Sequence, residues 1–209
     1  MVLGAMATFN NKKRLLDIGA GTGILGLMVA QNHDKIAVHG IESNQKAAID
    51  LKQNYASSPF PNSFTALEMD FLSLSGEKFD AFIVNPPFYV EGYLGADAEL
   101  NDAKHVGSLD LSSLLDKMDA LAEEGAECWM IWPFNSINLV HQTFFELPWS
   151  LKASIIINGK PGHPKRVVLQ WAKTESEMPV VSLLTIRDEK GNYTEEYKAL
   201  TLEFHGVKL

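Results

Sequence analysis

The chain has 209 residues, of which 46% are apolar and 21% charged, and its net charge is −8. These values are ordinary for a soluble globular protein and predict one domain over residues 1–209. No apolar run approaches the ~20 residues of a membrane-spanning helix, and the start lacks the charged region of a secretory signal. The single cysteine, Cys128, excludes an internal disulfide. We therefore expect a cytoplasmic protein with a buried thiol.

Apolar runs alternate with segments of helical spacing from residue 14 to residue 147. This alternation predicts an α/β fold with a mostly parallel sheet covered by helices on both faces. Beyond residue 150, strand-like runs follow one another without helices, which predicts antiparallel hairpin pairing at one edge. The third expected helix should stop at Gly125. Expected strands are 14–19, 35–42, 64–70, 79–85, 126–132, 150–158, 166–173 and 179–186, and expected helices are 23–33, 44–58, 109–125 and 136–147.

A glycine-rich loop, "DIGAGTGILG", follows the first expected strand, at the end of the sheet where ligands bind in such folds. It has two interpretations. Gly21, Gly23 and Gly26 match the dinucleotide fingerprint G-x-G-x-x-G. Asp17 followed by glycines at 19, 21 and 23 is instead typical of S-adenosylmethionine enzymes. An acid before the glycines sits badly beside a pyrophosphate but suits the ammonium group of a methionine, which favours the second interpretation.

Two acidic residues end the next two expected strands. Glu42 closes the second strand, where a carboxylate can accept hydrogen bonds from both hydroxyls of a ribose. Ser43 follows it and is expected to cap the next helix. Asp70 closes the third strand, where it can accept from the amino group of an adenine, with Phe71 against the base. The alternatives are a helix N-terminal acid for Glu42 and an ordinary loop acid for Asp70.

The stretch "NPPF" follows the fourth expected strand and can hold a planar amine. The side-chain oxygen of Asn85 and the backbone carbonyl of Pro86 can each accept a hydrogen bond from one N–H of the amine. Together they can turn the amine nitrogen toward a sulfonium methyl group. Pro86 and Pro87 fix φ and hold that carbonyl still. Phe88 offers a flat face for the base, worth ~1–3 kcal/mol. The alternative is a proline-rich turn that ends a strand.

The pairing of "DIGAGTG" with "NPPF" resembles the class I amino-methyltransferases that act on planar amines. Over nearly the whole chain, the sequence is similar to the bacterial tRNA1(Val) (adenine-37-N6)-methyltransferase family. The segments "VLGAMA", "HPKRVVLQW" and "GNYTEEYKALTLEF" resemble parts of that family. Family members carry about thirty further residues before "VLGA", including a Gly-Thr-Asp segment, which this chain is expected to lack. In that family the segment bears on closure over the donor and on contact with tRNA, so both are open for this chain.

The resemblance implies a Rossmann-like, seven-stranded sheet, mostly parallel with an antiparallel edge hairpin. It implies S-adenosyl-L-methionine as methyl donor, S-adenosyl-L-homocysteine as product and tRNA as partner. It also implies a monomer with no membrane or metal partner. The donor-binding residues implied are Asp17, Gly19, Ala20, Gly21, Gly23, Glu42, Ser43, Asp70, Phe71 and Asn85, and the catalytic residues are Asn85, Pro86, Pro87 and Phe88.

A basic segment lies late in a chain whose net charge argues against nucleic-acid binding. Residues 151–172 contain four Lys or Arg side chains and no acid. In "GKPGHPKR", Lys160, Lys165 and Arg166 are expected phosphate contacts. The alternative is a solvated surface without a partner.

Several functions stay open on the residues alone. The amine clamp would equally suit guanine N2 of rRNA, adenine N6 of DNA or a glutamine amide of a protein. A second interpretation, an NAD-dependent oxidoreductase, is based on the G-x-G-x-x-G match, but it does not explain the "NPPF" stretch. A non-enzymatic RNA-binding protein is the third class, if the missing segment is essential for turnover.

Overall fold

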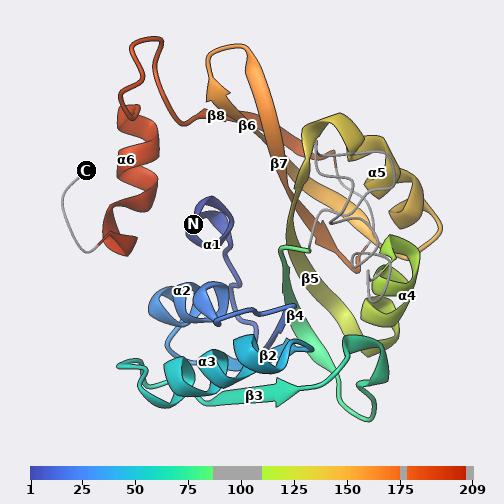
Figure 1. The fold of residues 1–209 in the computed structure, drawn as a ribbon. Coiled ribbons are helices and arrows are strands. Elements are labelled where there is room, and N and C mark those ends of the chain that lie inside the picture. Colours follow the sequence, from blue (N-terminus) through green and yellow to red (C-terminus); the bar gives the residue numbers. More distant parts are fainter. Residues whose placement is uncertain (87–109, 175–177, 206–209) are drawn as a thin grey trace, which may run out of the picture.

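The computed structural model describes residues 1–86, 110–174 and 178–205 (Figure 1). The strands are β1 (Arg14–Ile18), β2 (Ala37–Glu42), β3 (Phe64–Glu68), β4 (Phe79–Val84), β5 (Ala122–Pro133), β6 (Ser150–Lys160), β7 (His163–Ala172) and β8 (Val180–Thr185). The helices are α1 (Val2–Met6), α2 (Ile24–Asn32), α3 (Gln45–Ala56), α4 (Leu111–Leu121), α5 (Ile137–Phe145) and α6 (Glu195–Thr201), with short 3-10 helices η1 (Phe71–Ser73), η3 (Phe134–Ser136) and η4 (Leu202–Phe204).

The described strands form one sheet in the order β3-β2-β1-β4-β5-β7-β6-β8. Strands β1 to β5 pair in parallel, whereas β7 is antiparallel to both β5 and β6. The predicted α/β fold and its antiparallel hairpin are confirmed. The seven strands implied by the resemblance are one too few, because Val180–Thr185 pairs in parallel with β6 outside the hairpin. The eight strand-like runs recognised in the sequence all form strands.

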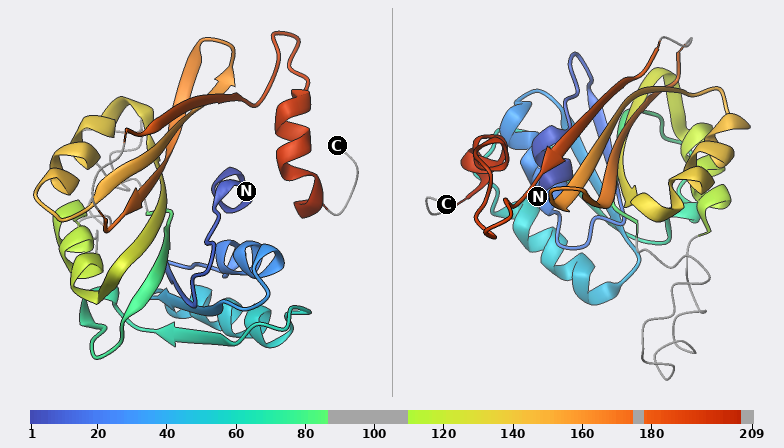
Figure 2. Two further views of the ribbon diagram at one scale, coloured as in Figure 1. Left: turned by 180° about the vertical axis from the view of Figure 1, so that it is seen from behind. Right: turned by 90° about the horizontal axis from the view of Figure 1, so that it is seen from above.

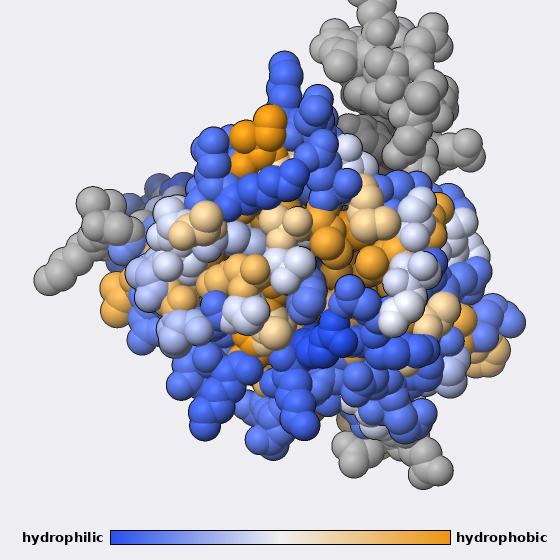
Figure 3. Space-filling model, turned by 90° about the horizontal axis from the view of Figure 1, so that it is seen from below, coloured by the Kyte–Doolittle hydropathy of each residue, from blue (hydrophilic) through white to orange (hydrophobic). Residues whose placement is uncertain are grey.

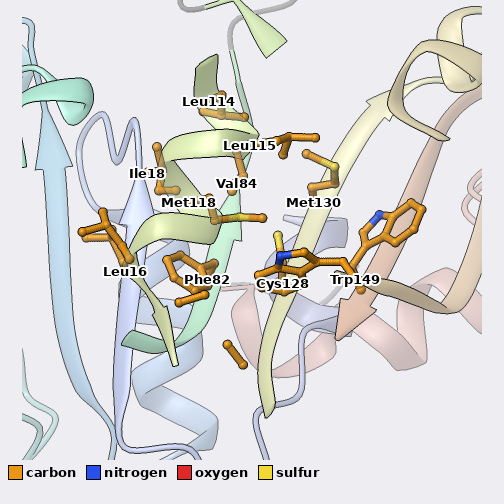
Figure 4. Close-up of a cluster of buried hydrophobic side chains, with 14 of the residues drawn as sticks. Leu16, Ile18, Phe82, Val84, Leu114, Leu115, Met118, Cys128, Met130 and Trp149 are labelled. Carbon is orange, nitrogen blue, oxygen red and sulfur yellow. The ribbon is translucent and has the colours of Figure 1, made fainter. Parts of the chain in front are cut away.

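The sheet buries apolar side chains on both faces, because successive residues of a strand point to opposite sides. In β1, Leu15 packs with α1, α2 and α3, whereas Leu16 packs with α4 and α5. Figure 4 shows part of the core cluster on the Leu16 side of the sheet, where Phe82 of β4 and Cys128 of β5 lie near Met118 of α4. The buried thiol expected at Cys128 is confirmed, and burial raises its pKa above the ordinary range.

Three details of the helices differ from the expectation. Helix α4 ends at Leu121, because Ala122 takes an extended conformation and begins β5. The expected stop at Gly125 is therefore wrong, and Gly125 lies within β5 with a φ of 73°. The short helices α1 and α6 were not expected. Helix α6, capped by Thr194, packs against α1, so the closing segment lies beside the start of the chain (Figures 1 and 2).

The surface is mixed in character. The face seen in Figure 3 is hydrophilic along much of its rim, with apolar residues toward its middle. Scattered exposed apolar side chains are normal for a folded domain. Among the residues that the structure describes, no helix is long and apolar enough to span a membrane.

Candidate active site

The ends of β1 to β4 meet at the carboxyl edge of the sheet. Ile18, the last residue of β1, pairs with Ile41 and with Val84, and Glu42 pairs with Glu68. The segments that follow these strands therefore start side by side. This edge is where open α/β sheets bind ligands. The expectation that the glycine loop, Glu42, Asp70 and Asn85 all follow strands at one edge is confirmed.

The glycine loop connects β1 to α2 and contains three left-handed residues. Gly19, Gly21 and Gly23 have φ of 68°, 56° and 85°, which glycine adopts at little cost. Apart from the glycine itself and its two chain neighbours, no described residue has an atom within 4 Å of a Cβ built on Gly19 or Gly21. Packing within the chain does not explain these two glycines, and they leave open backbone beside the first turn of α2. Such a loop suits a ligand that approaches the backbone closely.

Three glycines at or near this loop allow close packing of Tyr55. A Cβ on Gly23 would lie 2.7 Å from Cε1 of Tyr55, and one on Gly26 would lie 2.3 Å from the Tyr55 hydroxyl oxygen. A Cβ on Gly40 would lie 2.8 Å from the same oxygen. Tyr55 of α3 thus fills a notch lined by glycines of α2 and β2. The close packing accounts for Gly26, so the G-x-G-x-x-G match does not by itself require a dinucleotide.

Asp17 lies beneath the loop and is only 1% exposed. Its Oδ2 accepts a hydrogen bond of 3.0 Å from the Gly26 amide, which ties the end of β1 to α2. Its Oδ1 has no hydrogen-bond partner among the described residues. Burial raises the pKa of Asp17 to about 7; the bond from Gly26 opposes this rise and the nearby charge of Glu42 adds to it. The expected contact with a methionine ammonium group stays a prediction.

Glu42 links the glycine loop to α3. Its Oε2 accepts from the Gly21 amide and its Oε1 from the Asn44 amide, both at 2.8 Å. Each carboxylate oxygen keeps a further lone pair, so two ribose hydroxyls can still be bound. The expected cap, Ser43, is wrong. Asn44 stands one residue nearer the helix, and its Oδ1 accepts from the Ala47 amide at 3.1 Å.

Asp70 and Phe71 follow β3 and differ in exposure. Asp70 is exposed and caps η1, because its Oδ1 accepts from the Leu72 amide at 3.1 Å. Its carboxylate is therefore accessible at the edge of the sheet. Phe71 is 5% exposed and belongs to the core cluster beneath α4. The expected contact of Phe71 with the base stays a prediction.

Asn85 and Pro86 come directly after β4. Because Val84 pairs with Ile18, these two residues begin next to the start of the glycine loop. Asn85 is exposed and Pro86 is half-buried, and the proline ring restricts the backbone of Pro86. The expected acceptor pair thus stands at an accessible position beside the loop. Pro87 and Phe88, the rest of the expected clamp, lie outside the described residues.

The basic segment reaches the same edge of the sheet from the other side of β5. Arg166 pairs with Pro133 at the carboxyl end of β5, and Lys160 pairs with His163 at the hairpin turn. Lys160 and Lys165 are exposed. The hairpin therefore lies two strands away from Asn85.

One contact of the site carried no local signal in the sequence. The Asn54 side chain, on α3, donates a hydrogen bond of 2.8 Å to the Thr22 carbonyl across 32 residues. Asn44, in contrast, has a residue type that commonly caps helices, and this signal could have found it. Within the part of the chain that the structure describes, no group of three or more His, Cys, Asp or Glu side chains could hold a metal ion.

Known proteins share this architecture. A methyltransferase small domain family matches residues 2–101. A crystal structure described as a predicted O-methyltransferase from Agrobacterium tumefaciens superposes with a TM-score of 0.73, at 16% identity, covering 96% of this chain and 94% of that one. Magnesium protoporphyrin IX methyltransferase from Synechocystis, solved with bound S-adenosylmethionine, gives a TM-score of 0.54 at 15% identity, covering 77% and 69% of the two chains. Fold and site together define a class I methyltransferase.

Curated relatives narrow the class to one family. The chain is 30% identical over 210 residues to the tRNA1(Val) (adenine(37)-N6)-methyltransferase of Actinobacillus succinogenes, covering 98% of this chain and 87% of the relative. It is 32% identical over 211 residues to the enzyme of the same name from Salmonella enteritidis, covering 98% and 85%. The chain belongs to the tRNA1(Val) (adenine(37)-N6)-methyltransferase family.

Proposed function

We propose that this protein transfers a methyl group from S-adenosyl-L-methionine to N6 of adenine 37 in a valine tRNA. The observation that carries the proposal is the register between Val84 and Ile18, which sets Asn85 and Pro86 beside the open glycine loop. The relatives named above support the choice of nucleotide. We also propose that the protein acts as a monomer. A tRNA substrate places the reaction in the cytoplasm.

The edge of the sheet fits S-adenosylmethionine. The open backbone at Gly19 and Gly21, beside the first turn of α2, suits the methionine carboxylate. Glu42 is the proposed ligand of the ribose hydroxyls, and the exposed carboxylate of Asp70 is the proposed acceptor for the adenine amino group. When bound, this donor supplies an electrophilic methyl group on a sulfonium centre and departs as S-adenosyl-L-homocysteine. Gly26, the last glycine of the dinucleotide fingerprint, is already accounted for by its packing against Tyr55, so that fingerprint gives no separate support for a dinucleotide.

Asn85 and Pro86 act on the target amine. The lone pair of an adenine N6 amine is delocalised into the ring, which makes it a poor nucleophile. The Asn85 Oδ1 and the Pro86 carbonyl each accept a hydrogen bond from one N–H of this amine. These two hydrogen bonds orient the nitrogen and localise its lone pair as the bond to the methyl carbon forms. The restricted backbone of Pro86 sets this geometry before the substrate arrives. A strong base is not required, because the amine proton becomes acidic only as the new bond forms, and it then leaves to water.

The transfer itself is testable with the full chain and an unmodified valine tRNA transcript. We expect N6-methyladenosine in the nucleosides after incubation with S-adenosylmethionine, measured by mass spectrometry, and no product with a transcript that carries guanine at position 37. Methylation of guanine N2 in rRNA, or of DNA or protein instead of tRNA, would contradict the proposal. Calorimetric binding of NAD without binding of S-adenosylmethionine would favour an oxidoreductase.

We further propose that the β6–β7 hairpin contacts tRNA phosphates, because it shares the edge of the sheet with Asn85. Replacing Lys160 and Lys165 by alanine should weaken tRNA binding and reduce the slope of log K against log salt by about 1 for each lysine. Lys35, exposed at the opposite edge just before β2, provides the matched control. If the double variant and Lys35→Ala showed equal salt slopes, the hairpin would not be part of the tRNA interface.

A further inference from the structure

The glycine loop carries a continuous chain of hydrogen bonds from β2 to α3. Glu42 Oε2 accepts from the Gly21 amide at 2.8 Å. The carbonyl of the same peptide, on Ala20, accepts from the Gly23 amide at 2.8 Å. The carbonyl of that next peptide, on Thr22, accepts from the Asn54 side chain at 2.8 Å. Two loop peptides are thus each bound at both ends.

A peptide group is planar, so fixing its N–H and its C=O fixes its orientation. The Ala20–Gly21 peptide is fixed by Glu42 on one side, and the Thr22–Gly23 peptide is fixed by Asn54 on the other. Hydrogen bonds in a chain also polarise one another, so each strengthens its neighbours. The end groups of the chain are the carboxylate of Glu42 and the amide of Asn54, and removing either one frees a peptide to rotate.

Tyr55 holds the outer end of this chain in place. Its ring lies in the notch lined by Gly23, Gly26 and Gly40, and its side chain is 5% exposed. A buried aromatic at this position leaves α3 little freedom to slide against the loop. Asn54, the preceding residue, is exposed, and its side chain reaches Thr22 from a helix that is already fixed. The hydrogen bond is therefore preorganised rather than incidental.

We propose that Asn54 is a positioning residue for the methyl donor, acting through the Thr22–Gly23 and Ala20–Gly21 peptides on the Glu42 carboxylate. This inference rests on the proposed function for the identity of the ligand. It gives Asn54 no contact with the reacting atoms. Its effect is on the orientation of the open loop and on the direction in which Glu42 presents its lone pairs.

The test is calorimetric binding of S-adenosylmethionine and S-adenosylhomocysteine to the full chain. Asn54→Ala should raise both dissociation constants roughly tenfold, as expected for one lost, preorganised hydrogen bond. Asn54→Asp keeps the shape but cannot donate to a carbonyl, so it should behave like the alanine variant. Gln53→Ala, on the neighbouring exposed position, should bind the donor like the wild type. At saturating donor, kcat and the KM for tRNA should stay within twofold of the wild type.

Two outcomes would overturn the inference. If the wild type binds the donor and Asn54→Ala binds it equally well, Asn54 has no positioning role, and the proposed function is untouched. If donor affinity, kcat and Tm fall together in Asn54→Ala and Asn54→Asp, Asn54 only supports the fold. A wild type that binds neither ligand would refute the proposed function itself, and the inference with it.

Discussion

Replacing Asn85 with alanine should lower the rate of methyl transfer by about 10²–10³-fold, the usual cost of removing one preorganised polar group from a transition state. Asn85 is exposed at the end of β4, so its truncation removes no core packing. The loss should appear in kcat, because the hydrogen bond strengthens only as charge leaves the amine nitrogen. Donor affinity should fall far less than the rate, because the Glu42 and glycine-loop contacts are not altered, even though the resemblance also counts Asn85 among the donor-binding residues.

Single-turnover transfer to tRNA and calorimetric titration of S-adenosylmethionine together check this prediction. Asn85→Asp is the matched variant, because its carboxylate still offers an acceptor at the same position. We expect it to retain more transfer than Asn85→Ala. An alanine variant with the wild-type rate would show that the amine is held elsewhere, and the register argument from Val84 and Ile18 would then lose its functional meaning.

The edge of the sheet that carries the candidate site could be predicted from the sequence because its signals are local. A strand that ends in an acid, a glycine turn and a helix are consecutive in the chain, and parallel strands necessarily bring such ends to one edge. The role of Tyr55 could not be read this way. Its contacts with Gly23 and Gly40 join segments that are distant in sequence, and no periodic pattern reports them.

Two local predictions failed for a related reason. Ser43 and Asn44 are both good capping residues, and the choice between them depends on where α3 begins, which Glu42 sets by binding the Asn44 amide. Gly125 is a common type of helix stop, but the pairing of β5 with β4 already starts at Ala122. In both cases tertiary contacts, rather than residue preference, fixed the boundary.

The sequence and the structure indicate different roles for Asp17. The sequence interpretation made it a ligand for a charged ammonium group. In the structure its side chain lies on the α2 and α3 side of the sheet, as Leu15 does two residues earlier, and it is 1% exposed. The Tyr55 hydroxyl lies in the same interface and, like Asp17 Oδ1, has no hydrogen-bond partner among the described residues. A neutral side chain is better suited to these surroundings than an ionised one.

Asp17→Asn should therefore stabilise the protein at pH 8. Burial raises the pKa of Asp17 from 3.8 to about 7 in the folded state. Between these values folding takes up a proton, so stability falls as pH rises through this window and then stays level above pH 7. The ionisation cost at pH 8 is on the order of 4 kcal/mol as an upper bound. The asparagine Oδ1 can still accept the hydrogen bond from the Gly26 amide.

Urea unfolding of both proteins from pH 4 to pH 8 measures this effect, because the contributions of the other carboxylates cancel in the difference between them. The stability gain of the variant should grow from pH 4 to pH 7 and then level off. A constant difference across this range would mean that Asp17 is ionised in the folded protein. Donor titration of the same variant then separates the two roles. Retained affinity assigns Asp17 to the link between β1 and α2, whereas a large loss of affinity in a stabilised variant would restore the contact with the methionine ammonium group.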